Sequence, residues 1–186
     1  MKPANPSSID LVLRETTQQS EPVFDGSLLH VRRDTVLLPN QRTTTREYIV
    51  HPGASVIVPL LEDGKLLLEQ QYRYPIQRII IEFPAGKIDA GESPLAAAQR
   101  ELTEETGWVA QSWDFLGSIS PVPAYSDEWI HCFAAEHMTR QHTRLDEDEA
   151  IVCIALTPEE VAAKIASGEI VDAKTICAFH FWQARR

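Results

Sequence analysis

The chain has 186 residues, of which 44% are hydrophobic and 24% charged, enough for one sizeable core but too little for two comfortable domains. The formal net charge of −10 argues against partners that are nucleic acids or anionic membranes, because both require a basic surface. Phosphate-bearing ligands remain compatible with this charge, because divalent cations can bridge the two sets of negative groups.

Two further observations concern the environment of the chain. No apolar run approaches the roughly 18 residues that span a bilayer, and the first ten residues contain no apolar signal-peptide region. We therefore expect no transmembrane helix and a cytoplasmic protein. The three cysteines, Cys132, Cys153 and Cys177, fit neither a disulfide framework nor a zinc site, and we expect them to be reduced core residues.

The first third of the chain is expected to be mostly sheet. Residues 1–50 alternate apolar stretches with polar turns, which predicts consecutive antiparallel strands. These apolar stretches are residues 11–13, 28–31, 35–38 and 48–50. Two longer β-rich runs follow at residues 55–61 and 65–72, and the Asp63-Gly64 pair between them predicts a hairpin.

The centre of the chain predicts a loop followed by a well-delimited helix. Residues 84–92 contain several turn formers and no helical period, so they are expected to form a loop. A helix is predicted over residues 94–106, with Ser93 as its N-cap and Gly107 as its stop.

The last third alternates strands and helices. Strands are predicted at residues 113–119 and 130–136, on either side of a Pro-rich loop, and a third at residues 150–156. Thr157 and Glu160 have the spacing of a capping box ahead of a helix that reaches Ser167. Residues 173–182 are expected to form an amphipathic terminal helix.

Three glutamates on the predicted 94–106 helix stand out. Glu101, Glu104 and Glu105 are three and four residues apart, so their carboxylates share one helix face and repel one another. A solvated acidic face is the ordinary interpretation of such a string. The alternative is a metal site, since Mg²⁺ prefers carboxylate and water oxygens as ligands.

The surrounding spacing favours the metal site. From Gly86, five residues precede Glu92 and seven more precede an uninterrupted Arg-Glu-Leu-Thr-Glu-Glu-Thr-Gly-Trp string. This pattern resembles the Nudix box, whose fixed positions are Gly86, Glu92, Arg100, Glu101, Leu102, Glu104, Glu105, Gly107 and Trp108. The resemblance implies an α+β Nudix fold, an α/β/α sandwich of mixed sheet, over residues 51–186. Residues 1–50 would form an N-terminal antiparallel β-rich region for dimerisation and substrate binding.

The resemblance covers nearly the whole chain and is to the ADP-ribose pyrophosphatase branch of the family. It is carried by Arg46-Glu47, Gln71-Tyr72-Arg73, the Glu-Phe-Pro-Ala-Gly string at residues 82–86, Pro123, and the tail at residues 168–182. One departure is Ser120-Pro121-Val122-Pro123, where many relatives have Ser-Pro-Gly. This departure leaves the sugar of the substrate open.

The resemblance implies a Mg²⁺-dependent pyrophosphohydrolase, with Mn²⁺ as a possible substitute ion. Its metal ligands would be the Ala85 carbonyl and the carboxylates of Glu101, Glu104 and Glu105. Arg100 would orient or neutralise a neighbouring glutamate, although a surface salt bridge is the alternative. A general base is implied in the acidic loop before the strand at residues 150–156. Glu149 is the best positional match for this base, Glu147 is the reserve, and Glu104 remains if neither acts.

The resemblance also implies the substrate contacts. Arg73 and Glu82 would lie near the diphosphate and terminal ribose, while Arg46 and Pro123 would complete the substrate site. ADP-ribose, cleaved to AMP and ribose 5-phosphate, is the leading substrate, and GDP-mannose or ADP-glucose is the alternative. Relatives exchange their N-terminal strands in a homodimer, which we expect here too. A catalytically silent Nudix-fold nucleotide sensor is the non-enzyme alternative, because a fold alone does not establish activity.

Overall fold

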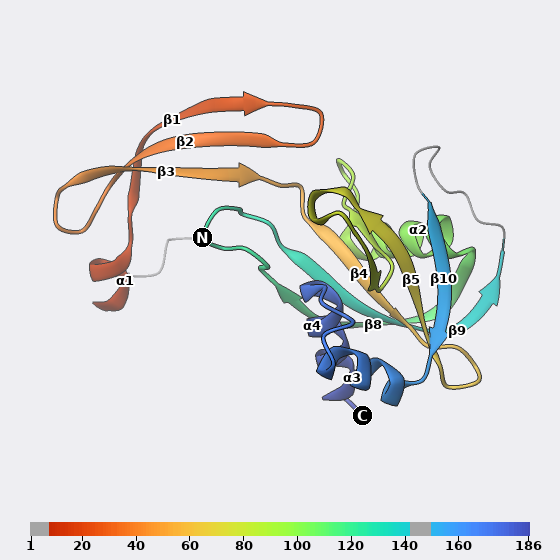
Figure 1. Ribbon diagram of the computed structural model, residues 1–186. Coiled ribbons are helices and arrows are strands. Elements are labelled where there is room, and N and C mark those ends of the chain that lie inside the picture. The colour runs from red at the N-terminus through yellow and green to blue at the C-terminus, as the bar shows by residue number, and fades with distance from the viewer. Residues whose placement is uncertain (1–7, 142–149) are drawn as a thin grey trace. The chain divides into compact units, whose positions relative to one another are not determined.

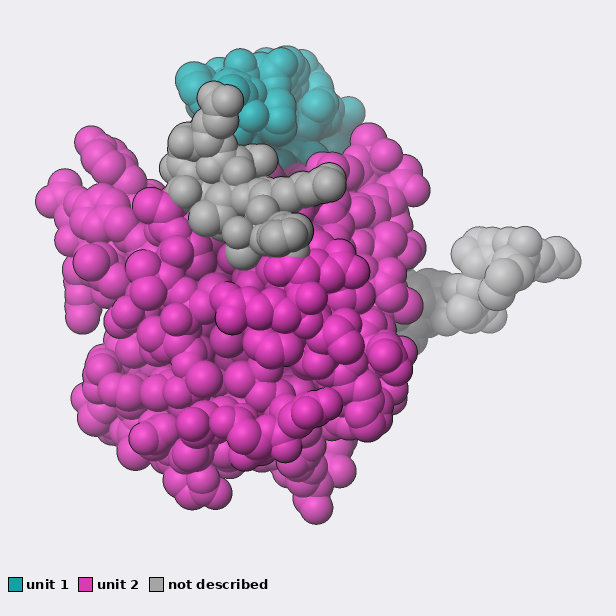
Figure 2. All heavy atoms as spheres, turned by 90° about the vertical axis from the view of Figure 1, so that its right-hand side faces the viewer, with its two compact units in different colours: residues 1–51, 122–128 teal, residues 52–121, 129–186 magenta. Residues whose placement is uncertain are grey.

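The computed structural model describes residues 8–141 and 150–186, and the chain forms two compact units. Unit 1 consists of Met1–His51 and Val122–Glu128, and unit 2 of Pro52–Pro121 and Trp129–Arg186. Figure 2 colours the two units separately. The sequence gives no reason to expect that a short segment from the middle of the chain belongs to the N-terminal unit.

Unit 1 is an antiparallel sheet preceded by a short helix (Figure 1). Its elements are α1 (Ser8–Leu13), β1 (Thr16–Asp25), β2 (His30–Leu37) and β3 (Thr43–Val50), with the strands in the order β1-β2-β3. The prediction of antiparallel strands is confirmed for β3, whereas residues 28–31 and 35–38, expected as two strands, contribute to the single strand β2. It is wrong for residues 11–13, which end α1. It also missed β1, because that strand is polar, exposed along its whole length and lacks an apolar period.

The described residues of unit 2 form two sheets. Its strands are β4 (Ala54–Pro59), β5 (Leu66–Arg73), β6 (Arg78–Glu82), β7 (Ala85–Lys87), β8 (Trp108–Ile119), β9 (Ile130–Arg140) and β10 (Ile151–Leu156). One sheet has the order β7-β4-β9-β8 and the other β10-β5-β6. β4 pairs in parallel with β9, and the other pairs in both sheets are antiparallel, so the first sheet is mixed.

Helices cover both faces of the mixed sheet. Every residue of β4 is buried, and successive side chains enter different cores. Val56 and Val58 pack in the core that includes Trp182 of α4 (Ala173–Gln183) and Val161 of α3 (Pro158–Ala166). Ile57 packs instead in the core of α2 (Pro94–Thr106). This arrangement is the α/β/α sandwich that the sequence predicted, and no described helix is long and apolar enough to cross a membrane.

The predicted hairpin between β4 and β5 is wrong. The turn forms, since Leu61 N–H donates to the Lys65 carbonyl and Gly64 N–H to the Leu61 carbonyl, at 2.9 and 3.0 Å. Beyond it, the strands share only the single bridge between Leu60 and Leu66. β4 pairs instead with β7 and β9, and β5 pairs with β6 and β10, so the two strands belong to different sheets.

The predicted ends of α2 are confirmed. The Ser93 hydroxyl accepts a hydrogen bond from Ala96 N–H at 3.2 Å, and Gly107 ends the helix in the left-handed conformation with φ 70°. Both features fix the register of the helix, which determines where its acidic side chains lie. The capping box of Thr157 and Glu160 is likewise present at the start of α3.

Candidate active site

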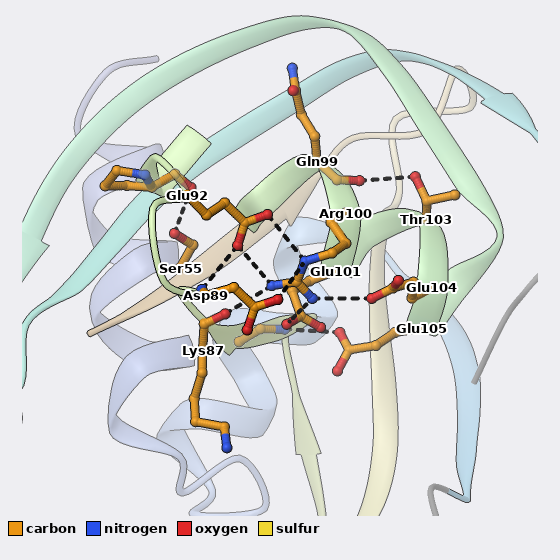
Figure 3. Close-up of polar contacts among 12 residues, drawn as sticks. Ser55, Lys87, Asp89, Glu92, Gln99, Arg100, Glu101, Thr103, Glu104 and Glu105 are labelled. Atoms are coloured by element: carbon orange, nitrogen blue, oxygen red, sulfur yellow. Dashed lines mark hydrogen bonds and ion pairs between the residues drawn. The ribbon is translucent and has the colours of Figure 1, made fainter. Parts of the chain in front are cut away.

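Two acidic side chains of helix α2 contact the guanidinium of Arg100 on the same helix (Figure 3). Nη1 of Arg100 lies 2.7 Å from Oε1 of Glu101 and 3.1 Å from Oε2 of Glu104. One cation therefore holds two like-charged carboxylates side by side, which offsets the repulsion expected from their helical spacing.

Arg100 also ties the helix to the loop that precedes it. Its Nε and Nη2 donate to the two oxygens of Glu92 at 3.1 and 3.0 Å, and Nη2 donates to the Lys87 carbonyl at 2.9 Å. The hydrogen bond from Arg100 lowers the pKa of Glu92, and the same bond is the main cause that raises the pKa of Arg100. The guanidinium thus stays charged and fixes the loop against the helix.

Gly86 lies against the carboxylate of Glu101. A Cβ on residue 86 would fall 1.8 Å from Oε1 of Glu101 and 1.9 Å from its Cδ. Glycine at this position therefore leaves the space that the Glu101 carboxylate occupies. The strand β7 that carries Gly86 is held by antiparallel pairing with β4, where Gly86 faces Ser55.

Glu105 is tied to the same short strand. Its Oε2 accepts a hydrogen bond from Ala85 N–H at 3.0 Å, and only 5% of the residue is exposed. A buried carboxylate needs such a donor, because burial without one is costly. The Ala85 backbone and the carboxylates of Glu101 and Glu105 thus come together from β7 and α2.

These residues offer the ligand types that a hard divalent cation takes, namely carboxylate oxygens and a carbonyl oxygen. Across residues 8–141 and 150–186, no three His, Cys, Asp or Glu side chains converge in an arrangement that could hold a metal ion. Arg100 engages Glu101 and Glu104 instead, and Ala85 N–H engages Glu105. These ligand atoms suit a divalent cation, which would compete with Arg100 for the carboxylate oxygens of Glu101 and Glu104.

The structure places Arg73 and Glu82 together but gives them different exposures. Nε and Nη2 of Arg73 donate to Oε1 and Oε2 of Glu82 at 2.8 and 2.9 Å. The Arg73 side chain is 40% exposed, whereas that of Glu82 is fully buried. Sequence reasoning missed a second partner of Glu82, Lys174 of α4, which lies 92 residues further along the chain.

The remaining predicted site residues lie in unit 1 or outside the described residues. Arg46 and Pro123 belong to unit 1, where Arg46 forms an ion pair with Glu15 at 2.6 Å and Pro123 is exposed. The two predicted bases, Glu147 and Glu149, lie outside the described residues.

A cavity of about 410 Å³ adjoins Glu105. Trp108, Arg140 and Cys153 contribute to its lining, and the Arg140 guanidinium lies 5.9 Å from the centre of the Trp108 ring. The three cysteines are free, as expected, but Cys153 is exposed and the prediction of a core position is wrong for it.

Glu69 is a second residue that sequence reasoning missed. It is fully buried on β5, in register with Glu82 on one side and Cys153 on the other. The alternation along β5, in which Leu67, Glu69 and Gln71 share one face, was the available signal. Burial is the main cause that raises the pKa of Cys153, and the charges of Glu69 and Glu105 add to it.

Comparison with known protein families gives two adjoining matches. Residues 50–179 match the NUDIX domain, and residues 15–49 match the nucleoside diphosphate sugar hydrolase N-terminal domain. The first match spans most of unit 2, and the second spans the strands of unit 1.

Individual relatives cover nearly the full length. The chain is 36% identical over 174 residues to a methanol dehydrogenase activator of Bacillus methanolicus, covering 92% of this chain and 94% of that protein. It is 35% identical over 175 residues to an ADP-ribose pyrophosphatase of Bacillus subtilis (strain 168), covering 93% and 95%. The fold is that of a solved ADP compounds hydrolase, with a TM-score of 0.84 at 24% identity, covering 93% of this chain and 94% of that one.

Proposed function

Because this chain belongs to the Nudix hydrolase family, we propose that it is a Mg²⁺-dependent pyrophosphohydrolase that converts ADP-ribose and water to AMP and ribose 5-phosphate. The observation that carries the proposal is the joining of α2 and β7, in which Glu101 lies against Gly86 and Glu105 accepts from Ala85 N–H. The N-terminal match and the ADP-ribose pyrophosphatase relative support the substrate class.

The residues of α2 and β7 would have different roles in hydrolysis. The Ala85 carbonyl and the carboxylates of Glu101, Glu104 and Glu105 would hold the cation, which when bound supplies neutralising charge for the diphosphate. Arg100 keeps Glu101 and Glu104 together, and Ala85 N–H fixes Glu105.

The remaining chemical need is a base. Water adds to one phosphorus, the P–O–P bond breaks, and the proton of the attacking water must go to an acceptor. We assign this acceptor to Glu149 from the family resemblance, with Glu147 as the reserve. The carboxylates of α2 are less suitable, because binding a cation lowers their basicity.

Arg73, Arg46 and Pro123 are the proposed substrate contacts. Arg73 offers a half-exposed cation for the diphosphate, held rigidly by Glu82. Arg46 and Pro123 in unit 1 are proposed to contact the rest of the nucleotide sugar. Another nucleotide sugar, such as GDP-mannose or ADP-glucose, is the alternative substrate, because the box determines the diphosphate chemistry and not the groups on either side.

We also propose a homodimer formed through the N-terminal strands. β1 is an edge strand in which every residue is exposed, and such an edge offers unpaired backbone groups to another chain. Several large apolar side chains of unit 1 are exposed as well, namely Ile9, Val12, Leu13, Val23, Phe24, Leu28 and Leu29. A monomeric mass by light scattering at micromolar concentration, in an active sample, would refute the dimer. We place the protein in the cytoplasm, in keeping with its free cysteines.

The substrate is tested with a panel of ADP-ribose, GDP-mannose, ADP-glucose and a nucleoside triphosphate, each with Mg²⁺. The proposal expects the highest kcat/KM for ADP-ribose. A higher value for another nucleotide sugar would move the substrate within the same chemistry. Failure to hydrolyse any member, together with tight binding of one, would favour the nucleotide sensor.

A further inference from the structure

We propose that Lys174 is a positioning residue for substrate binding. From α4 it fixes the carboxylate of Glu82, which in turn holds the Arg73 guanidinium in the orientation that receives the diphosphate. This inference rests on the proposed function, because it assigns a role within the same site.

Glu82 binds the Arg73 guanidinium from one side. Both carboxylate oxygens of Glu82 accept from one edge of the guanidinium, formed by Nε and Nη2. Such a two-point contact fixes the plane of the guanidinium as well as its position. Among the described residues, Nη1 of Arg73 donates no hydrogen bond, and the side chain is 40% exposed, so the Nη1 side of the guanidinium remains available to a ligand.

Glu82 itself cannot be the group that meets a ligand from solvent. Its side chain has no exposed surface, and both of its oxygens are occupied by cations. A fully buried carboxylate is retained at a cost unless charges and hydrogen bonds compensate it. In this position it acts through the residues it holds, which are Arg73 and Lys174.

Lys174 completes this compensation from a distant part of the chain. Its Nζ contacts Oε2 of Glu82 and lies 3.1 Å from Oδ2 of Asp172, and its side chain is 14% exposed. Burial alone lowers the pKa of Lys174, but the charges of Asp172 and Glu82 outweigh it and raise the pKa. Lys174 therefore stays protonated, and the four side chains Arg73, Glu82, Lys174 and Asp172 form a charge-balanced row.

Hydrogen bonds hold the start of α4 in place and thereby fix the position of Lys174. Oδ2 of Asp172 caps the helix by accepting from Thr175 N–H at 2.9 Å and from the Thr175 hydroxyl at 2.6 Å. The same hydroxyl accepts from Phe83 N–H at 2.9 Å, next to Glu82 in the chain. The helix is thus joined to the end of β6 by a backbone contact and a side-chain contact on adjacent residues.

This anchoring also lies close along the chain to the proposed metal site. Glu82 precedes Ala85 by three residues, and Ala85 N–H binds Glu105. One short segment therefore carries both the group that orients Arg73 and the backbone that meets the acidic helix. Loss of Lys174 is expected to loosen Arg73 while leaving the contacts of α2 in place, because those contacts involve neither Glu82 nor α4.

The test compares Lys174→Met with Lys164→Met. Lys164 also forms an ion pair with a glutamate, Glu169 at 2.6 Å, but it lies on α3 outside the site. With ADP-ribose and saturating Mg²⁺, we expect Lys174→Met to raise KM about tenfold with kcat within about twofold, the pattern of lost binding. Lys164→Met should leave both constants unchanged. Lys174→Arg, which keeps the charge beside Glu82, should recover most of the loss in KM.

A double-variant comparison separates positioning from a general structural effect. In an Arg73→Ala background the group that Lys174 orients is absent, so adding Lys174→Met should change KM by less than about twofold. If Lys174→Met alone does not fold, Lys174→Met combined with Glu82→Gln removes the uncompensated buried charge and should show the same rise in KM.

A folded Lys174→Met protein with unchanged KM would overturn the inference, and so would an effect that adds fully to that of Arg73→Ala. These outcomes differ from failure of the proposed function. An inactive wild-type protein contradicts the assigned activity, whereas an active wild type that is insensitive to Lys174 contradicts only the positioning role.

Discussion

Gly86 and Glu101 approach each other so closely that a single added carbon on residue 86 would overlap the Glu101 carboxylate, at 1.8 Å from Oε1. The overlapping atoms are the far end of a flexible side chain, so an added methyl group can be accommodated by moving Glu101. The cost of a substitution therefore falls on the position of the carboxylate and not on the backbone.

We predict that Gly86→Ala lowers kcat/KM for ADP-ribose by about 10²-fold or more, because a metal ligand displaced from its position no longer serves the reaction. The melting temperature should fall only slightly. Gly64→Ala is the matched control, since residue 64 has φ 84° and nothing within 4 Å of an added Cβ. It should lose stability through backbone strain and keep its activity. An active Gly86→Ala enzyme would show that Glu101 need not occupy this position.

We predict that Glu105→Gln abolishes turnover at saturating Mg²⁺, with a loss of at least about 10²-fold in kcat. The fold should survive, because the amide oxygen of glutamine can still accept from Ala85 N–H. Steady-state kinetics and a thermal melt measure the two effects separately, and Glu62→Gln, in an exposed turn, serves as the control. Rates close to wild type would remove Glu105 from the metal site.

We predict that Glu149→Gln lowers kcat by about 10²-fold to 10⁴-fold, the usual effect of losing a general base, with little change in Mg²⁺ affinity. A titration of activity against Mg²⁺ measures both constants. If Glu149→Gln is silent and Glu147→Gln is not, the role belongs to Glu147. If both are silent, an external base is wrong for this enzyme and Glu104 becomes the candidate.

We predict that Cys153 reacts slowly with iodoacetamide at pH 8 although it is exposed. Partial burial of the thiol, together with the charges of Glu69 and Glu105, raises its pKa above the ordinary value for cysteine. Because the thiolate is the reacting form, the raised pKa means that reactivity is low at neutral pH and still increases as the pH is raised beyond 8. Peptide mass spectrometry after timed alkylation gives the rate at each pH. A rate that has already levelled off at pH 8 would contradict the raised pKa.

The sequence predicts the parts of this protein that depend on local signals. The ends of α2 and the capping box of α3 were predicted because a cap, a proline or a glycine acts within one helical turn. The acidic group on α2 followed from helical spacing together with the box pattern. β1 was not predicted, because it forms a strand through its pairing with β2 and its own composition does not indicate one.

What the sequence could not provide is contact between distant segments. Lys174 and Glu82 are 92 residues apart, and nothing in either sequence neighbourhood indicates that the start of α4 lies against the end of β6. The wrong prediction of a β4–β5 hairpin has the same cause. The turn between the two strands was predicted correctly, but β4 and β5 each pair with strands from other parts of the chain. Likewise, Gly86 was recognised from its place in a pattern, whereas the reason for glycine there is its approach to Glu101.

The most direct test of the central claim is product analysis of ADP-ribose incubated with the wild-type protein, with and without Mg²⁺, by chromatography against authentic standards. We predict equimolar AMP and ribose 5-phosphate that appear only with a divalent cation and disappear on chelation by EDTA. Unchanged ADP-ribose in the presence of Mg²⁺, or the same products at the same rate in EDTA, would contradict the assignment of this chain as a metal-dependent ADP-ribose pyrophosphohydrolase.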